Sequence, residues 1–207
     1  MQRGKFIVFE GIDGSGKSTQ SKILAENLRK KGIDCAETLE PTYGMVGAVL
    51  HDILSGRKAA DPKVTAALFV ADRLEHLTNP QNGVCKMLEE GTTVICDRYY
   101  FSSYAYQSVE VPADWVIEAN SLAARILRPD CTIFIDISPE EAMKRIAENR
   151  ENIELYENLD RLTAVRGGYF DAFEKMKDSE RIKIFDGNKS VKKIAEEIEK
   201  FVLGELF

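Results

Sequence analysis

Residues 6–19, which read FIVFEGIDGSGKST, decide the fold of this chain. Four β-branched or aromatic residues at positions 6–9 predict a buried strand. Residues 11–18 then match the phosphate-loop pattern G-x-x-x-x-G-K-[ST] at every fixed position. Apolar side chains recur at helical spacing through residues 18–30. A strand, a glycine-rich turn and a helix in this order predict a nucleotide-binding loop. The alternative is a glycine-rich turn that binds nothing.

The chemistry of such a loop follows from its glycines and its position before a helix. Backbone N–H groups can point at a polyphosphate, and the helix N-terminus adds a partial positive charge. Lys17 can reach the terminal phosphates, and Ser18 can offer a hydroxyl to Mg²⁺. The residues expected to bind the nucleotide are Gly11, Ile12, Asp13, Gly14, Ser15, Gly16, Lys17, Ser18 and Thr19.

Composition narrows the class of protein. The 207 residues, 44% of them hydrophobic, are enough for one α/β core, so residues 1–207 are expected to form a single domain. The net charge of −6 and the lack of a basic block argue against a protein that coats nucleic acid. Four cysteines without C-x-x-C spacing are expected to be small buried hydrophobes and not zinc ligands. Glu10 interrupts the first apolar run, which is too short for a signal sequence or a membrane span, so we expect a cytoplasmic protein.

Strand-like and helix-like segments alternate along the rest of the chain. This alternation predicts an α/β fold of the three-layer α/β/α P-loop type, with a five-stranded parallel sheet and ligands at the carboxyl ends of its strands. The turn at Glu40 and Pro41 follows the second strand and is expected at that ligand-binding edge. Beyond the first strand, the expected strands cover residues 34–39, 92–96, 131–137 and 181–185.

A helix that begins at Asp61 and Pro62 carries an aromatic residue on its polar side. Its apolar stripe is expected to pack on the sheet and comprises Val64, Ala67, Leu68, Ala71 and Leu74. Phe69, Arg73 and His76 fall on the opposite side. Because Phe69 and Arg73 are four residues apart, they can project into one site that suits a planar base and a phosphate. The alternative is that Phe69 contacts another helix or a subunit and Arg73 is solvated.

The third strand runs directly into Asp97 and Arg98. An aspartate in this position of a phosphate-loop protein typically holds the metal, and an arginine can grip a second phosphate through two hydrogen bonds. Alternatively, the two side chains pair with each other or cap the next helix. The Tyr- and Ser-rich run at residues 99–106 is expected to form a wall for a base and sugar, although its first three aromatic residues also suit a core.

Residues 148–157 are almost entirely polar. Such a segment has little to bury and is expected to be mobile without ligand. We expect an arginine-bearing lid, because phosphoryl transfer requires charge neutralisation and exclusion of water. The alternative is a solvated loop without function.

Taken together, these motifs resemble thymidylate kinases, and the resemblance runs nearly from end to end. The segments that carry it are FEGIDGSGKST at residues 9–19, the Glu40-Pro41 loop, residues 68–73, residues 97–99 with the Ser/Tyr run, and Val165-Arg166 followed by Tyr169. The resemblance implies a homodimer that transfers a phosphoryl group from ATP to dTMP with Mg²⁺. It implies that Asp13 contacts the acceptor sugar or phosphate.

The same resemblance implies roles for the other residues. Phe69 would stack on thymine, Arg73 would contact the base edge or the phosphate, and Arg98 would clamp the dTMP phosphate. The implied catalytic residues are Lys17, Arg98, Arg150 and Asp13. The implied substrate site comprises Glu40, Phe69, Arg73, Arg98, Ser102, Ser103, Tyr106 and Gln107. Arg145 would bind the nucleotide from the lid region, and Ser18 and Asp97 would hold the metal.

Two positions deserve comparison with the family pattern. Gly14 stands where some members carry a basic residue, so this chain resembles the branch whose catalytic arginine comes from the lid, and Arg150 is the candidate. His51 stands where an arginine is usual, and histidine carries less positive charge at pH 7. Either Arg73 and Arg98 suffice for the acceptor phosphate or the acceptor binds more weakly.

Two other functions fit the same motifs. One is a kinase for another nucleoside monophosphate or for a deoxynucleoside, because base preference rests on a few contacts. The other is an ATP-binding regulatory protein without an acceptor. The several arginines argue against the second, since a protein that binds only ATP has no use for a second phosphate clamp.

Overall fold

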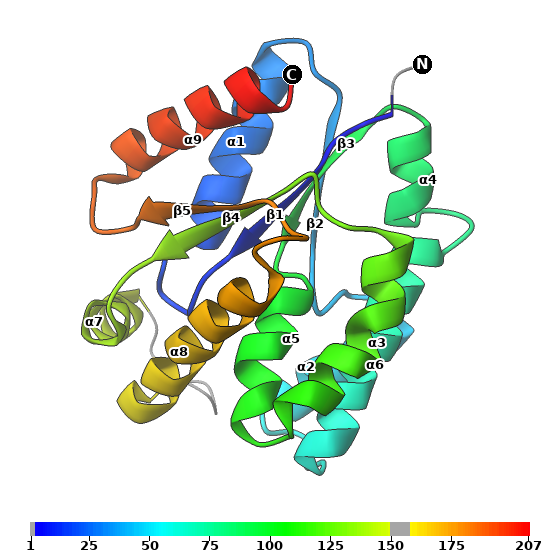
Figure 1. Ribbon diagram of the computed structural model, residues 1–207, viewed down its shortest axis with the longest axis vertical. Helices are drawn as coiled ribbons and strands as arrows, with labels where there is room; N and C mark the ends of the chain where they lie inside the picture. Colours follow the sequence, from blue (N-terminus) through cyan, green and yellow to red (C-terminus); the bar gives the residue numbers. More distant parts are fainter. Residues whose placement is uncertain (1–2, 150–157) are drawn as a thin grey trace.

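The computed structural model describes residues 3–149 and 158–207 and shows a twisted sheet between two layers of helices (Figure 1). The strand order is β2-β3-β1-β4-β5, and every neighbouring pair is parallel. The strands are β1 (Phe6–Glu10), β2 (Cys35–Leu39), β3 (Thr93–Asp97), β4 (Cys131–Asp136) and β5 (Ile182–Asp186). The predicted five-stranded parallel sheet and the three-layer α/β/α class are confirmed.

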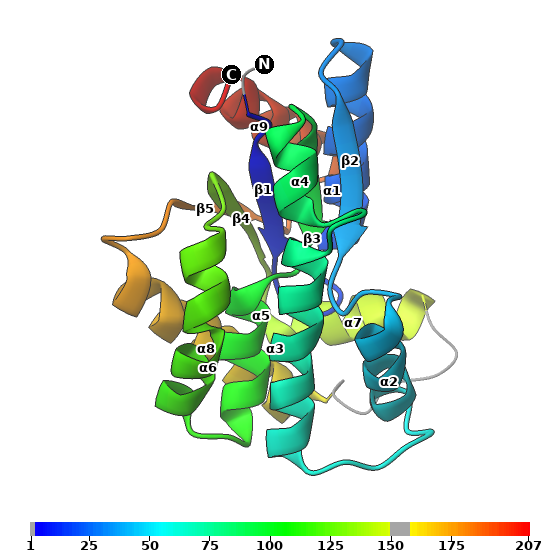
Figure 2. The same cartoon turned by 90° about the vertical axis from the view of Figure 1, so that its right-hand side faces the viewer.

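The two helical layers are unequal. Helices α1 and α9 cover one face of the sheet, and most of the others gather on the opposite face or below it (Figures 1 and 2). The helices are α1 (Lys17–Lys30), α2 (Met45–Leu54), α3 (Pro62–Thr78), α4 (Val84–Glu89), α5 (Tyr100–Tyr106), α6 (Ala113–Ile126), α7 (Pro139–Asn149), α8 (Leu159–Met176) and α9 (Val191–Glu205). A short 3₁₀ turn, η1 (Gln107–Val109), follows α5.

Alternation along β1 divides the core between the two faces. Ile7 and Phe9 pack with α1 and α9, whereas Phe6 and Val8 pack with α4, α5, α6 and α8. All four side chains are fully buried, as expected for the central strand of a parallel sheet covered on both faces. The chain leaves β1 at the carboxyl edge of the sheet. The loops that follow β3 and β4 emerge at the same edge, because these strands run parallel to β1.

Helix α3 buries a different face from the predicted one. Val64, Ala67 and Ala71 of the predicted sheet-facing stripe are exposed. The buried positions are Thr65, Ala66, Asp72, Arg73, His76 and Leu77. The prediction was wrong because α3 packs among α2, α4 and α6, and its buried face carries polar groups that find partners there. Polar side chains can be buried when they have hydrogen-bond or ion-pair partners. A search for apolar stripes does not detect a buried face of this kind.

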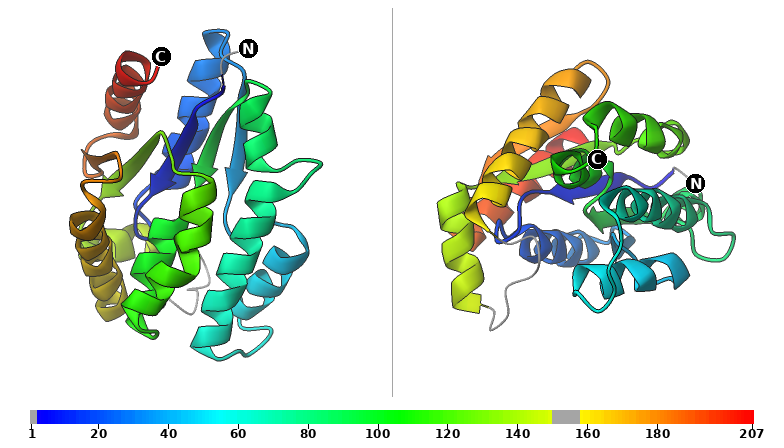
Figure 3. Two further views of the ribbon diagram at one scale, coloured as in Figure 1. Left: turned by 45° about the vertical axis from the view of Figure 1, so that its right-hand side comes forward. Right: turned by 90° about the horizontal axis from the view of Figure 1, so that it is seen from below.

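Helix α5 was not predicted as a helix. All seven of its residues are buried, and a helix that is buried all round has no amphipathic period to detect. Tyr99, Tyr100 and Phe101 are at most 1% exposed and belong to the core, which was the alternative interpretation of these aromatic residues. The last turns of α5 instead face the functional site. Helix α5 packs against α8 and α6, and Figure 3 shows these helices below the carboxyl edge of the sheet.

Two further expectations can be compared with the described residues. Cys35, Cys96 and Cys131 are buried thiols and Cys85 is half-buried, and all four are free. Within residues 3–149 and 158–207, we find no helix with the length and apolar character needed to cross a membrane.

Candidate active site

The glycine-rich turn lies between β1 and α1, as predicted. Gly16 precedes the first residue of α1 with φ 92°, a left-handed conformation that favours glycine. No side chain caps this end of α1, so its first N–H groups are directed at the space before the helix. That space is a cavity, which we call the phosphate-loop pocket. Its lining residues are Asp13, Gly14, Ser15, Gly16, Lys17, Ser18, Thr19, Gln20, Arg145, Ile146, Gly187, Lys189, Val191 and Ile194.

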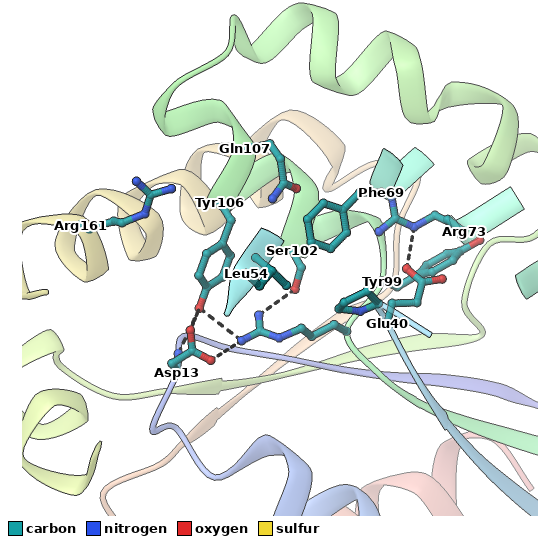
Figure 4. A pocket seen from close by; sticks show the side chains of 12 residues that line it. Asp13, Glu40, Leu54, Phe69, Arg73, Tyr99, Ser102, Tyr106, Gln107 and Arg161 are labelled. Atoms are coloured by element: carbon teal, nitrogen blue, oxygen red, sulfur yellow. Dashed lines mark hydrogen bonds and ion pairs between the residues drawn. The ribbon is translucent and has the colours of Figure 1, made fainter. Parts of the chain in front are cut away.

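A second cavity, which we call the arginine pocket, lies between α2, α3, α5 and α8 (Figure 4). Phe69 and Arg73 enter it from α3, and Tyr106 and Gln107 enter it from the end of α5 (Figure 4). Its lining residues are Asp13, Glu40, Pro41, Leu54, Phe69, Arg73, Arg98, Tyr99, Ser102, Tyr106, Gln107 and Arg161. The two pockets share Asp13, so they are adjacent.

Arg98 and Asp13 form the boundary between the pockets. The Arg98 guanidinium donates to Asp13 and to the Ser102 hydroxyl, 3.1 Å away, and it lies 4.8 Å from the centre of the Tyr106 ring. Burial lowers the pKa of Arg98, but Tyr106, Asp13, Tyr169 and Asp97 together oppose burial and raise the pKa well above its usual value. Arg98 has φ 74°, which is uncommon and strained for a residue other than glycine. The fold therefore holds a charged guanidinium at this boundary, although the backbone of Arg98 adopts a conformation that is unfavourable for a residue with a side chain.

Arg73 is held by a separate set of buried groups. Its Nε donates to Glu40 at 2.8 Å, and its Nη1 donates to Ser103 at 3.1 Å and to Asn120. The Arg73 side chain is only 1% exposed. Burial lowers the pKa of Arg73, but Glu40, Tyr99 and Glu10 together oppose burial, and the pKa is raised above its usual value. Arg73 is thus a charged residue fixed in the wall of the arginine pocket.

Glu10 organises the start of α5 from the end of β1. Its Oε1 accepts from the backbone N–H groups of Tyr99 (2.8 Å) and Ser102 (3.1 Å). Its Oε2 accepts from the hydroxyls of Ser102 (2.6 Å) and Tyr169 (2.9 Å). Burial raises the pKa of the Glu10 carboxyl, although these donors and Arg98 oppose the shift. A fully buried carboxyl group therefore satisfies N–H groups at the start of α5 and holds the Ser102 hydroxyl that accepts from Arg98.

Ser18 and Asp97 lie together in a third cavity, which Asp13, Lys17 and Arg98 also line. The Ser18 hydroxyl donates to Asp97 Oδ2. Asp97 Oδ1 is buried, and within the described residues it has no hydrogen-bond partner. A hydroxyl beside a carboxylate oxygen that lacks a partner suits a hard cation such as Mg²⁺. Asp97 bonds Ser18 while Arg98 bonds Asp13, so the structure gives these neighbours different partners.

Lys17 is buried beside the same groups. Its Nζ lies 3.5 Å from Asp13 Oδ1, and the residue is 6% exposed. Burial and the nearby Arg98 lower the pKa of Lys17, while Asp13 and Asp97 oppose this. An anion that enters the phosphate-loop pocket would favour the charged form of Lys17.

The structure brings most of the predicted site residues to the phosphate-loop pocket or the arginine pocket, with some exceptions. Asp97 lines neither of these two pockets. Gly11 and Ile12 do not line the phosphate-loop pocket, and the Ile12 side chain is in the core. Ser103 does not line the arginine pocket but bonds Arg73 behind it. Arg145 lines the phosphate-loop pocket and donates to the Gly187 carbonyl at 3.0 Å. Arg150, and residues 150–157 of the predicted lid, lie outside the described residues.

His51 does not line the arginine pocket. Its Nε2 lies 3.1 Å from the Thr42 carbonyl oxygen, and its ring stacks on Tyr43 with centroids 4.8 Å apart and planes 13° apart. His51 therefore supports the loop after β2.

Several residues of the site had not been predicted. Asn120 bonds Arg73 from α6, Tyr169 bonds Glu10 from α8, and Arg161 lines the arginine pocket while pairing with Glu110 at 2.7 Å. Nothing in the local pattern marks Asn120 or Arg161, because each reaches the site through packing between distant helices. The sequence marks Tyr169 only through the family motif that it forms with Val165 and Arg166.

Known proteins resemble this chain over most of its length. The thymidylate kinase family model matches residues 9–198. A probable thymidylate kinase of Methanococcus aeolicus is 39% identical over 94% of this chain and 93% of its own length. Thymidylate kinases of Clostridium novyi and Ligilactobacillus salivarius are each 36% identical, over 98% and 94% of this chain and 100% and 95% of their own lengths.

Proposed function

This chain belongs to the thymidylate kinase family, and we propose that it transfers the γ-phosphoryl group of ATP to dTMP between the two pockets, giving ADP and dTDP. The main observation in support of this proposal is that the two pockets share a lining residue. Asp13 lines both cavities, so a phosphoryl group held in one is next to an acceptor held in the other. Proximity of this kind is the main source of rate in phosphoryl transfer.

The phosphate-loop pocket is the proposed ATP site. Backbone N–H groups at the start of α1 and the Lys17 ammonium would surround the phosphates. Arg145 and Gly187 also line this pocket, and we propose that the rest of the nucleotide extends toward them. ATP therefore spans the pocket from the loop to α7 in this proposal.

Mg²⁺ is the proposed metal, and Ser18 and Asp97 would hold it. The orphaned Asp97 Oδ1 supports this fit. No group of three or more His, Cys, Asp or Glu side chains suited to a metal occurs among the residues that the structure describes, so ATP phosphates and water would complete the ligands. When bound, the ion would neutralise part of the negative charge of the ATP phosphates.

Replacing Asp97 by asparagine is expected to raise the Mg²⁺ concentration needed for half-maximal activity by about tenfold or more. The amide keeps the size of the side chain and can still accept from Ser18, but it removes the negative charge. Steady-state rates measured across a Mg²⁺ titration test this expectation. Asp178→Asn, at an exposed position, is the matched control, and equal Mg²⁺ dependence in both variants would contradict the assignment.

The arginine pocket is the proposed dTMP site. Phe69 would stack on thymine, Arg73 would meet the base edge or the phosphate, and Arg98 would grip the phosphate. Ser102, Tyr106 and Gln107 would contact the base and deoxyribose, with Glu40 holding Arg73 in place. Support comes from the geometry, because an aromatic side chain and two fixed guanidinium groups converge on a cavity beside the phosphate loop.

Replacing Phe69 by alanine is expected to weaken dTMP binding by about 1–3 kcal/mol, the range for a base stacked on an aromatic ring. Titration calorimetry with dTMP measures the change, and ATP affinity should be unaltered because Phe69 does not line the phosphate-loop pocket. Val70→Ala, at the next and also half-buried position of α3, serves as control. Equal dTMP affinity in wild type and Phe69→Ala would remove the stacking role.

The reaction requires no covalent intermediate on the protein. The dTMP phosphate oxygen attacks the γ-phosphorus in line, and ADP leaves. Lys17 neutralises charge at the donor, Arg98 fixes the acceptor phosphate, and Asp13 orients both cations through contacts to each. Arg150 is the proposed arginine for the transferred group.

Two broader properties are also proposed. A homodimer is supported by apolar side chains that face solvent on α3 and α6, two helices in contact. Val64, Trp115 and Leu122 are 52%, 43% and 47% exposed. Large apolar side chains that are exposed near one another often mark a protein–protein interface. A cytoplasmic location is supported by the free thiols, which suit a reducing compartment.

The experiment that tests the function is a coupled ADP-release assay with dTMP, dUMP, dCMP, dGMP, UMP and thymidine as acceptors. We expect dTMP to give the highest kcat/KM. Preference for another monophosphate or for thymidine would identify a kinase with a different acceptor. ADP release that no acceptor stimulates would leave a nucleotide-binding protein without an acceptor.

A further inference from the structure

A chain of hydrogen bonds runs behind the arginine pocket from Arg73 through Glu40 and His76 to Thr38. His76 Nε2 lies 2.7 Å from the Thr38 hydroxyl on β2, and His76 Nδ1 lies 3.0 Å from Glu40 Oε1. The other oxygen of Glu40, Oε2, accepts from Arg73 Nε at 2.8 Å. His76, Glu40 and Arg73 are 8%, 3% and 1% exposed. One carboxylate therefore joins two side chains that are three residues apart on α3.

The directions of these hydrogen bonds follow from the chemistry of the partners. A carboxylate accepts only, so His76 Nδ1 must carry a hydrogen and donate it to Glu40. In a neutral ring, Nε2 then accepts from the Thr38 hydroxyl. Thr38 thus fixes the ring, and the ring fixes one oxygen of Glu40.

Glu40 needs such a partner because it belongs to a loop and not to a helix or strand. The loop is tied to α3 at a second point, where Thr42 donates its N–H (2.7 Å) and its hydroxyl (2.6 Å) to Asp72. That contact fixes the backbone two residues away but not the Glu40 carboxylate. Without His76, Oε1 would lose a buried donor and the carboxylate could rotate away from Arg73.

We propose that His76 is a positioning residue for the acceptor site: by donating to Glu40 Oε1 it sets the carboxylate that aims Arg73 at dTMP. His76 does not line the arginine pocket and acts only through Glu40. The inference rests on the proposed contact between Arg73 and dTMP. It deepens that proposal, because acceptor affinity then depends on a residue behind the pocket wall.

Two substitutions separate the nitrogens of the ring. The amide of asparagine ends at the same distance along the side chain as Nδ1, so His76→Asn can keep the donor to Glu40 and lose the contact to Thr38. The amide of glutamine reaches as far as Nε2, so His76→Gln keeps the contact to Thr38 and loses the donor to Glu40. His76→Phe removes both.

The measurement is KM for dTMP, KM for ATP and kcat for each variant, with thermal unfolding recorded in parallel. We expect His76→Phe and His76→Gln to raise KM for dTMP about tenfold, the loss of one buried hydrogen bond to a charged group. The KM for ATP should stay within about twofold. His76→Asn should remain within about threefold of wild type for dTMP. Leu77→Val, a fully buried neighbour on the same helix, should lower the unfolding temperature without raising KM for dTMP.

The outcomes are distinguishable. Equal KM values for dTMP in His76→Asn and His76→Gln, or a parallel rise in Leu77→Val, would overturn the positioning role and leave His76 as a structural residue. If His76→Phe does not fold, the Asn and Gln pair still decides. An Arg73→Ala variant tests the premise separately: if its KM for dTMP is unchanged, the proposed role of Arg73 fails. A large effect of Arg73→Ala beside no effect of His76→Gln would overturn only this inference.

Discussion

Replacing Arg98 by alanine is expected to lower kcat/KM for dTMP by about 10²–10³-fold. Two losses contribute to this decrease. The acceptor phosphate would lose the guanidinium proposed to bind it, and the Asp13 carboxylate, which is 20% exposed, would lose the hydrogen bond that Arg98 donates to it. Truncating one partner of a buried hydrogen-bonded charge pair costs about 2–5 kcal/mol, which corresponds to the expected factor. Steady-state kinetics with dTMP as the varied substrate provides the measurement.

Three variants control this experiment. Arg98→Lys keeps the charge but not the planar fork, so it should recover only part of the activity. Arg98→Gly should be as inactive as Arg98→Ala but more stable by about 1 kcal/mol, because φ 74° strains a side-chain-bearing residue. Arg181→Ala removes an exposed arginine that pairs with Glu205, away from both pockets, and should be fully active. A decrease of less than tenfold in Arg98→Ala would show that Arg98 does not hold the acceptor.

Replacing Arg150 by alanine is expected to lower kcat by at least about a hundredfold while leaving the fold intact. An arginine that meets the transferred phosphoryl group contributes about 10³–10⁵ in rate. The phosphate loop itself has no room for that side chain. Gly14 has φ 79°, and a Cβ there would lie 2.7 Å from the Ala142 carbonyl oxygen. The charge must therefore come from elsewhere, and Arg150 follows directly after α7.

Arg145→Ala is the matched control for Arg150→Ala. The Arg145 guanidinium contacts Glu141 at 2.8 Å and the Gly187 carbonyl at 3.0 Å, beside the phosphate-loop pocket. Its loss should raise KM for ATP more than it lowers kcat. Single-turnover rates separate the chemical step from binding for both variants. An unchanged rate in Arg150→Ala together with a large loss in Arg145→Ala would assign the catalytic role to Arg145.

Elements whose burial shows in their own apolar pattern were predicted correctly, and elements whose burial depends on partners elsewhere in the chain were not. Strands β1, β3 and β4 are the central strands of the sheet, and each is a continuous apolar run. A buried strand of this kind can be predicted from its own residues alone. The stripe on α3 was assigned to the wrong face, because the helix buries Asp72, Arg73 and His76 against loop and helix partners. Helix α5 has no polar face, so its pattern contained no helical period.

The sequence by itself determined the phosphate loop, the parallel sheet behind it and the placement of Asp97 and Arg98 at the end of a strand. The phosphate loop and the strand that ends at Asp97 are local features, because each depends on neighbouring residue types. The parallel sheet followed from the alternation of strand-like and helix-like segments along the chain. Only the tertiary structure decided which groups hold those side chains. Glu10 reaches the start of α5, and Glu40 lies between His76 and Arg73. A buried charge needs specific partners to offset its desolvation, and here those partners come from segments that meet only when the chain folds.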